Sequence, residues 1–172
     1  MKEYSSTSSP DRSRKPVEIT QYGRFPVVID YDQPIEELIQ ERRFEWSGVV
    51  FTNSNFPASE TGKTSADVFL LGFSYPVGSV DAVKEMGVLG FCPANLRALI
   101  TLDSTYPFLQ RRNPIAALGT GWRCAGYLYV PCLGKDRSSR NLGLITFEAD
   151  WETDWRFAAR KAAQAITQPW FE

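Results

Sequence analysis

The chain has 172 residues, of which 43% are hydrophobic and 23% are charged, and its net charge is -1. This length and composition predict one folded domain with a sizeable core and exclude a wholly disordered chain. No apolar run reaches the roughly 20 residues that a membrane-spanning helix needs, and the polar N-terminus lacks the apolar centre of a secretory signal. We therefore expect a cytoplasmic protein that has no membrane partner.

The sequence contains no histidine, which removes several kinds of chemistry. Without an imidazole there is no Ser–His or Cys–His nucleophile pair and no histidine general base. The cysteines, Cys92, Cys124 and Cys132, are too few for the thiolate set of a histidine-free zinc site. Their odd number and wide spacing predict reduced thiols rather than a disulfide framework. We expect no metal and no cofactor.

Residues 1–22 are predicted to form a disordered tail, and residues 23–172 a single globular domain. The tail consists mostly of Ser, Thr, Pro, Asp, Arg and Lys, so it has little apolar surface to offset the entropy of ordering. Its charges are mixed in sign, which argues against a basic arm for nucleic acid.

Within the domain, hydrophobic periodicity and turn residues predict strands and helices in a mixed order. In chain order, we expect a strand at 26–31, a helix at 32–43, strands at 48–52 and 67–75, helices at 79–86 and 93–104, strands at 115–120, 126–133 and 142–148, and a last helix at 155–163. Asp32 and Pro34 are start signals for the first of these helices.

Two segments contribute most to the predicted architecture. Residues 67–75 are apolar on both faces near their middle, which is typical of a central strand. Residues 155–163 are rich in alanine and therefore helix-prone. Because strands and helices do not alternate strictly, we predict an α+β fold. It would contain a single mixed or antiparallel sheet of about five to six strands packed against about three to four helices.

Two glycine-containing segments superficially match nucleotide-binding motifs. Residues 61–64 (TGKT) match the end of a phosphate loop, but Pro57 occupies the position of the first glycine that the motif needs. Residues 119–121 begin like a dinucleotide fingerprint, but Cys124 occupies the third glycine position. We interpret the first segment as a loop and the second as a tight turn between strands.

An acidic segment alternates with aromatic residues near the end of the domain. Its members are Glu148, Asp150, Glu152 and Asp154, with Trp151 and Trp155 between and after them. In an extended segment the four acids would share one face. They fit a solvated strand end that leads into the N-terminus of the last helix, where acids are favourable. An acidic contact surface and a cation site are the alternatives, although the calcium-loop pattern is absent.

The region 97–140 is basic, whereas the first 90 residues are acidic. Its candidate contact residues are Arg111, Arg112, Arg123, Arg137 and Arg140. Together with the paired helices at 79–86 and 93–104, these residues raise the hypothesis of nucleic-acid binding. The second helix offers only Arg97 to a groove, and the sequence pI of about 5.6 provides little long-range attraction, so this remains the alternative.

Cys92 is the one plausible nucleophile. It precedes Pro93 at the expected start of a helix, where the helix N-terminus can lower the pKa of a thiol. No histidine accompanies it, so an enzyme would have to use this cysteine or carboxylates.

Several motifs are spread over residues 45–161. They are Gly90-Phe91-Cys92-Pro93-Ala94-Asn95-Leu96-Arg97-Ala98-Leu99, Tyr106-Pro107-Phe108-Leu109-Gln110, Pro114-Ile115-Ala116-Ala117-Leu118-Gly119, Val130-Pro131-Cys132-Leu133 and Trp155-Arg156-Phe157-Ala158-Ala159-Arg160-Lys161. With these motifs the chain resembles a family of small uncharacterised bacterial proteins. The resemblance implies a self-contained domain of bacterial or mobile-element origin and assigns no activity and no catalytic residue.

From these observations we predict a non-enzymatic, cytoplasmic protein-interaction module with an accessory or regulatory role. A protein partner or a second copy of the chain is the expected ligand, and nucleic acid is possible. Trp170 and Phe171 are expected to dock on a surface, because two large aromatic side chains are costly to expose. An enzyme with carboxylate or cysteine chemistry is the third hypothesis.

Overall fold

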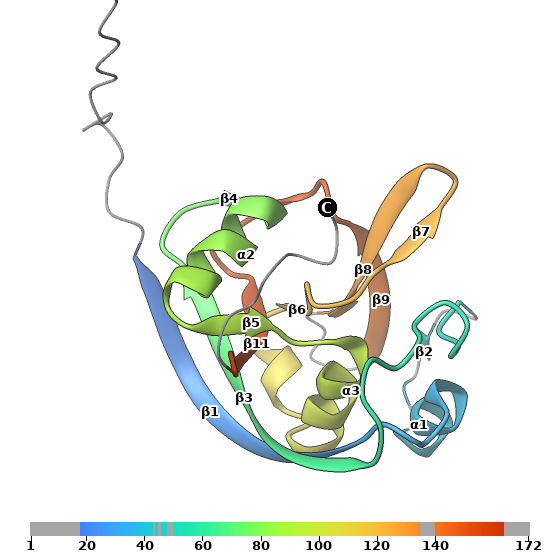
Figure 1. Ribbon diagram of the computed structural model, residues 1–172. Helices are drawn as coiled ribbons and strands as arrows, with labels where there is room; N and C mark the ends of the chain where they lie inside the picture. Colours follow the sequence, from blue (N-terminus) through green and yellow to red (C-terminus); the bar gives the residue numbers. More distant parts are fainter. Residues whose placement is uncertain (1–17, 43, 45, 48–49, 135–139, 164–172) are drawn as a thin grey trace, which may run out of the picture.

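The computed structural model describes residues 18–42, 44, 46–47, 50–134 and 140–163. In chain order the elements are β1 (Ile19–Asp30), α1 (Ile35–Arg42), β2 (Trp46–Ser47), β3 (Lys63–Phe73), β4 (Val77–Gly78), α2 (Ser79–Val88), β5 (Phe91–Pro93), α3 (Leu96–Thr105), the 3-10 helix η1 (Leu109–Arg111), β6 (Ile115–Ala116), β7 (Trp122–Cys124), β8 (Tyr127–Leu133), β9 (Asn141–Thr146), β10 (Asp150–Trp151) and β11 (Arg156–Lys161). Figure 1 shows their arrangement.

Nine of the described strands form one sheet in the order β1-β3-β11-β6-β8-β9-β2, with β5 paired to β11 and β7 paired to β8. Most pairs are antiparallel, whereas β11 with β6 and β2 with β9 are parallel. A separate ladder joins β10 and β4. The α+β class is therefore confirmed, but the sheet is larger than predicted. Among the strands that were not predicted, β5 and β7 are three residues long, too short for an alternating pattern to reveal them, and β11 was predicted as a helix.

The helix predicted at 155–163 is wrong, because Arg156–Lys161 forms β11 near the middle of the sheet. This strand pairs with β3 and β5 in antiparallel fashion and with β6 in parallel. Phe157 and Ala159 pack into one hydrophobic cluster and Ala158 into the other, as expected for a strand buried on both faces. Backbone pairing on both edges and tight packing outweigh the helix propensity of alanine, which amounts to less than about 1 kcal/mol per residue.

The two faces of the sheet are covered by different helices. One hydrophobic cluster contains buried residues of α1 and α3, and the other contains buried residues of α2. Along β3, Val68 and Leu70 belong to the first cluster, and Phe69 and Leu71 belong to the second. The prediction that residues 67–75 form a central strand covered on both faces is confirmed.

The N-terminal boundary and the first helix start differ in detail from the predictions. Residues 19–22, placed in the tail by the sequence, belong to β1 and pair with β3, because neighbouring strand edges satisfy backbone groups that composition ignores. Residues 1–17 of the predicted tail lie outside the described residues. The first backbone amide of α1, at Ile35, donates to Oδ1 of Asn53 rather than to Asp32, the predicted N-cap.

Other predicted elements are shifted or shortened. Val50–Thr52 is not a strand, and β2 lies earlier, at Trp46–Ser47; residues 48–49 are outside the described part. Only Ile115 and Ala116 of the strand predicted at 115–120 pair with neighbours. The polar residues 135–141 predict a hairpin-like turn between the last two strands, and residues 135–139 of it lie outside the described part.

No helix in the described part of the chain combines the length and the apolar character needed to cross a membrane.

Candidate functional site

The β7–β8 hairpin carries three aromatic side chains that share one face. Trp122 pairs with Tyr129, and Cys124 with Tyr127, so these side chains point the same way. The ring centroids of Trp122 and Tyr129 are 6.1 Å apart, and those of Tyr127 and Tyr129 are 6.4 Å apart. Tyr127 is 56% exposed and the other two rings are half-buried. We call Trp122, Tyr127 and Tyr129 the aromatic hairpin face.

The hairpin is held firmly although it projects from the rest of the chain, as Figure 1 shows in orange. Ala125 and Gly126 both have positive φ, 49° and 85°, which fits the tight two-residue turn that connects the strands. Trp122 packs on the cluster beneath α1 and α3, whereas Leu128 and Val130 pack into the opposite cluster. The hairpin therefore presents its aromatic rings from a fixed base.

The sequence did not identify this surface. Residues 119–121 were interpreted as a tight turn between strands, and β7 was missed because it is three residues long. Gly126 between short aromatic segments was a partial signal, since glycine tolerates the positive φ of a hairpin turn, but the alanine before it is not a residue typical of such turns.

The predicted basic contact residues do not form one surface. Arg111 and Arg112 are exposed at and just after η1, where the Arg111 guanidinium lies 4.9 Å from the ring centroid of Phe108. Arg123 is exposed on the face of the hairpin opposite the aromatic rings. Arg137 lies outside the described residues, and Arg140 is engaged in the interior.

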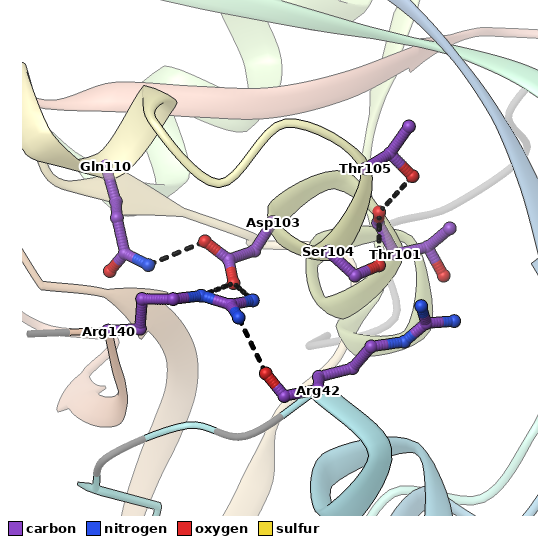
Figure 2. A network of polar contacts seen from close by, with 7 residues as sticks. All are labelled: Arg42, Thr101, Asp103, Ser104, Thr105, Gln110 and Arg140. Carbon is purple, nitrogen blue, oxygen red and sulfur yellow. Dashed lines mark hydrogen bonds and ion pairs between the residues drawn. The ribbon is translucent and has the colours of Figure 1, made fainter.

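Arg140 belongs to a polar network with the buried Asp103 of α3 (Figure 2). Its Nε donates to Oδ2 of Asp103 at 3.0 Å, and its Nη2 also contacts that oxygen. Gln110 donates to the other carboxylate oxygen at 2.6 Å. Burial raises the pKa of Asp103, and the contacts from Arg140 and Gln110 oppose that rise.

The same guanidinium also joins this network to α1, because Nη1 of Arg140 donates to the main-chain oxygen of Arg42 at 2.7 Å. Arg140 thus links the start of β9 to α1 and α3. Its role is structural, and it is not free to contact a partner as the sequence suggested.

Arg97, expected to face a nucleic-acid groove, is 4% exposed. Its Nη2 donates to Oδ1 of Asn53 at 2.9 Å, and its Nη1 donates to main-chain oxygens of Asp30 and Gln33. Burial lowers the pKa of its guanidinium. The side chain closes the turn between β1 and α1 and offers no surface charge.

The acidic residues Glu148, Asp150, Glu152 and Asp154 are all exposed, but they do not line one strand. Of this segment only Asp150 and Trp151 form a strand, β10, and turns flank it. The helix whose N-terminus was expected to favour these acids is β11. Among the described residues, no group of three or more possible metal ligands comes together.

Trp151 and Trp155, proposed as contact residues with these acids, pack on each other with ring centroids 4.7 Å apart. Trp151 is 1% exposed, and its Nε1 donates to Oγ of Ser79 at 2.7 Å. That hydroxyl in turn donates to the main-chain oxygen of Phe147. Trp151 is therefore a core residue that ties β10 to α2.

The cysteine environments do not favour nucleophilic chemistry. Cys92 donates weakly to the main-chain oxygen of Arg160 at 3.5 Å, and burial raises the pKa of its thiol. Burial raises the pKa of Cys132 to about 11. A catalytic thiol needs the opposite shift, since the thiolate is the nucleophile.

Thiol labelling tests these shifts. In a variant that keeps only Cys132, we expect Ellman's reagent at pH 8 to react about a hundredfold more slowly with the native protein than with the urea-unfolded chain, because the native thiolate is rarer. A variant that keeps only Cys92 should also react more slowly when native. Rapid native labelling of Cys92 with an apparent pKa below 7 would contradict this assignment and revive the hypothesis of a cysteine enzyme.

A second polar cluster surrounds Tyr31, whose hydroxyl accepts hydrogen bonds from Arg160 at 2.9 Å and Asn95 at 3.3 Å. Arg160 also forms an ion pair with Glu60 at 3.0 Å. Burial raises the pKa of Tyr31. The adjacent cavity holds about 10 Å³, which is less than one water needs, so a substrate would not fit there in this conformation.

A sizeable concavity among the described residues is a groove of about 550 Å³. It is lined by Pro26–Val28 of β1, Ser65–Asp67 of β3, Arg42 of α1, and Thr101 and Thr105 of α3. We call it the Arg42 groove. None of its residues belonged to the sites predicted from the sequence, because it brings together segments that are distant in the chain.

Comparison with models of protein families, with curated proteins and with solved structures finds no match. The resemblance to small bacterial proteins therefore stays a prediction.

Proposed function

We propose that this protein is a non-catalytic interaction module with an accessory or regulatory role in a bacterial cytoplasm, and that it binds a protein partner through the aromatic hairpin face. The observation that carries the proposal is the set of one exposed and two half-buried rings on a projecting but anchored hairpin. Tyrosine and tryptophan supply large contact areas at low entropic cost, and they dominate the binding energy of many interfaces.

Single-stranded nucleic acid is the second candidate, since bases stack on aromatic side chains and exposed Arg123 lies on the same hairpin. Two observations favour a protein partner instead. The guanidinium groups of Arg97 and Arg140 are engaged in the interior, and the net charge of -1 gives no overall attraction for phosphates.

Crosslinking from the hairpin tests the proposal. A photoreactive phenylalanine at position 127 should give a discrete protein adduct in a lysate of the source cell, whereas the same probe at the equally exposed Phe108 should not. The adduct is identified by mass spectrometry and the partner is then purified for titration. A nucleic-acid adduct, or identical adducts at both positions, would contradict the proposal.

With the purified partner, we expect Tyr127→Ser to weaken binding by about tenfold or more, in line with the loss of an aromatic anchor. The exposed position predicts a change in unfolding free energy within about 0.5 kcal/mol. Phe108→Ser, which also removes an exposed ring, is the matched control and should change the Kd by less than about twofold. Sedimentation of the protein alone distinguishes a second copy of the chain from a different partner.

A further inference from the structure

The Arg42 groove has the size and mixed character of a small-molecule site. Its volume of about 550 Å³ falls within the range of roughly 300–1,000 Å³ that is usual for such sites. Pro26, Val27, Val28 and Ala66 contribute apolar surface, and Arg42, Thr101 and Thr105 contribute polar groups. Apolar walls with a few placed polar groups are the usual composition of ligand pockets.

The neighbouring edge of β1 is poorly suited to a peptide that would add as a strand. β1 is the last strand on its side of the sheet. Pro26 has no backbone N–H, and its oxygen accepts a hydrogen bond from the Tyr106 hydroxyl at 2.9 Å. The oxygen of Asp30 accepts from Arg97. With these groups blocked or occupied, the ladder that strand addition requires is interrupted.

The side chain of Arg42 is a cation without a counter-ion among the described residues. No hydrogen bond or ion pair there involves its guanidinium, and its Nε is buried without an acceptor. In Figure 2 the side chain extends from its main-chain oxygen toward Thr101. A buried donor without an acceptor is costly. Because the Nε has almost no accessible surface, an anionic ligand would pair with the other nitrogens of the guanidinium, which no described residue engages.

Three other arginines show the usual arrangement. Arg24, Arg140 and Arg160 each form an ion pair with an acidic side chain, to Asp67, Asp103 and Glu60 respectively. The pairing of Arg24 with Asp67, at 2.8 Å, also compensates the carboxylate on the wall of the groove. The groove therefore keeps one positive charge that the described residues do not neutralise.

Hydroxyl groups lie on the same side of the groove. Thr101 is buried, and its main-chain oxygen accepts hydrogen bonds from the hydroxyls of Ser104 and Thr105 at 2.9 and 2.8 Å. No hydrogen bond within the described part of the chain uses the hydroxyl of Thr101 itself. A guanidinium fork beside a hydroxyl donor matches the two oxygens of a carboxylate. One cation suits a monoanion better than a phosphate dianion.

We propose that the Arg42 groove binds a small organic carboxylate. The carboxylate pairs with the guanidinium of Arg42 and accepts a hydrogen bond from Thr101, and the apolar part of the ligand packs on Val27 and Ala66, which pair across β1 and β3 and share the face that α3 covers. This site is separate from the aromatic hairpin face and does not depend on the function proposed for that face.

Titration calorimetry of the full chain with sodium benzoate, phenylacetate and hexanoate tests the site, with benzamide as a neutral analogue and inorganic phosphate as a second anion. We expect at least one carboxylate to bind at least about tenfold more tightly than benzamide and phosphate, because the guanidinium selects the monoanion. Arg42→Gln should weaken that binding by about tenfold or more, and Thr101→Val by a smaller factor.

Arg111→Gln removes the same charge from an exposed position outside the groove, so it should leave the Kd within about twofold. The interaction that ties Arg42 to Arg140 uses its main-chain oxygen, so the fold should tolerate Arg42→Gln, and a thermal melt checks this. If that variant does not fold, Arg42→Lys replaces it and should also weaken binding, because lysine lacks the fork. Three outcomes would overturn the proposal: no carboxylate binding, tighter binding of phosphate, or an affinity unaffected by the Arg42 and Thr101 substitutions.

Discussion

Replacing Gly119 by alanine is expected to destabilise the protein by about 3 kcal/mol, the upper end of the usual cost of overpacking. A Cβ at this position would lie 2.4 Å from the main-chain oxygen of Pro93 and 2.5 Å from that of Ala94. These atoms are backbone and cannot rotate away as a side chain could. A backbone shift that relieved this clash would also disturb the hydrogen bond from the Gly119 amide to the main-chain oxygen of Ala94, which measures 2.9 Å.

The strain would reach the centre of the sheet, because the amide of Ala94 donates to the oxygen of Ala158 in β11 at 2.8 Å. Equilibrium unfolding in urea measures the loss. Gly87→Ala is the matched control, since Gly87 lies in α2 with no atom within 4 Å of the added methyl group. That variant should gain roughly 0.5–1 kcal/mol, because alanine is the better helix former. A similar loss in both variants would contradict the packing described around Gly119.

Replacing Arg140 by methionine is expected to cost about 3 kcal/mol at pH 7, the lower end for breaking a buried ion pair by removing one partner. The lower end applies because the arginine side chain is 24% exposed. The variant leaves the carboxylate of Asp103 buried with Gln110 as its remaining partner. It also removes the hydrogen bond to the oxygen of Arg42.

The loss of stability caused by Arg140→Met should depend on pH. Burial raises the pKa of Asp103 in the folded protein, and loss of Arg140 should raise it further. A raised folded-state pKa means that the folded state binds the proton more tightly than the unfolded state. The deficit of the variant is therefore largest above the folded-state pKa and shrinks as the pH falls toward the ordinary aspartate value of about 4.

Unfolding in urea between pH 4 and pH 7 measures this change. The double substitution Asp103→Asn with Arg140→Met should be less destabilising at pH 7 than Arg140→Met alone, because no buried charge remains unpaired. Arg123→Met, at an exposed position, should change the stability by less than about 0.5 kcal/mol. A deficit of Arg140→Met that does not vary with pH would show that Asp103 does not carry the effect.

Local pattern was sufficient for part of this fold. The apolar character of residues 67–75 predicted a central strand, and the helices near 35–42, 79–88 and 96–105 were found at about their observed positions. Local pattern failed for β11, whose alanines look helical until the partners of the strand are known. It also failed for strands of two or three residues, such as β5 and β7, which pair with the longer strands β11 and β8.

The arginines of the predicted basic region do not gather on one surface, for a related reason. Whether an arginine lies in solvent or inside depends on contacts that are distant in the sequence. Arg140 pairs with Asp103 on α3, and Arg97 is held by Asn53 and by the main chain near the end of β1. Arg42 has no counter-ion among the described residues, although its segment is as rich in charged residues as theirs. The number of charged residues in a segment therefore does not show whether a particular arginine is exposed or buried.

The position of β11 has a consequence for the order in which the protein can form during synthesis. Leu71 of β3 pairs with Phe157 of β11, so a ribosome must make most of the chain before the middle of the sheet can close. Until then β3 has β1 on one edge and an open apolar edge on the other. Sheets that depend on pairings between residues distant in the sequence form slowly. Until they close, they expose unpaired strand edges that promote aggregation. Nascent chains stalled before residue 156 should accordingly be the species that chaperones bind most strongly.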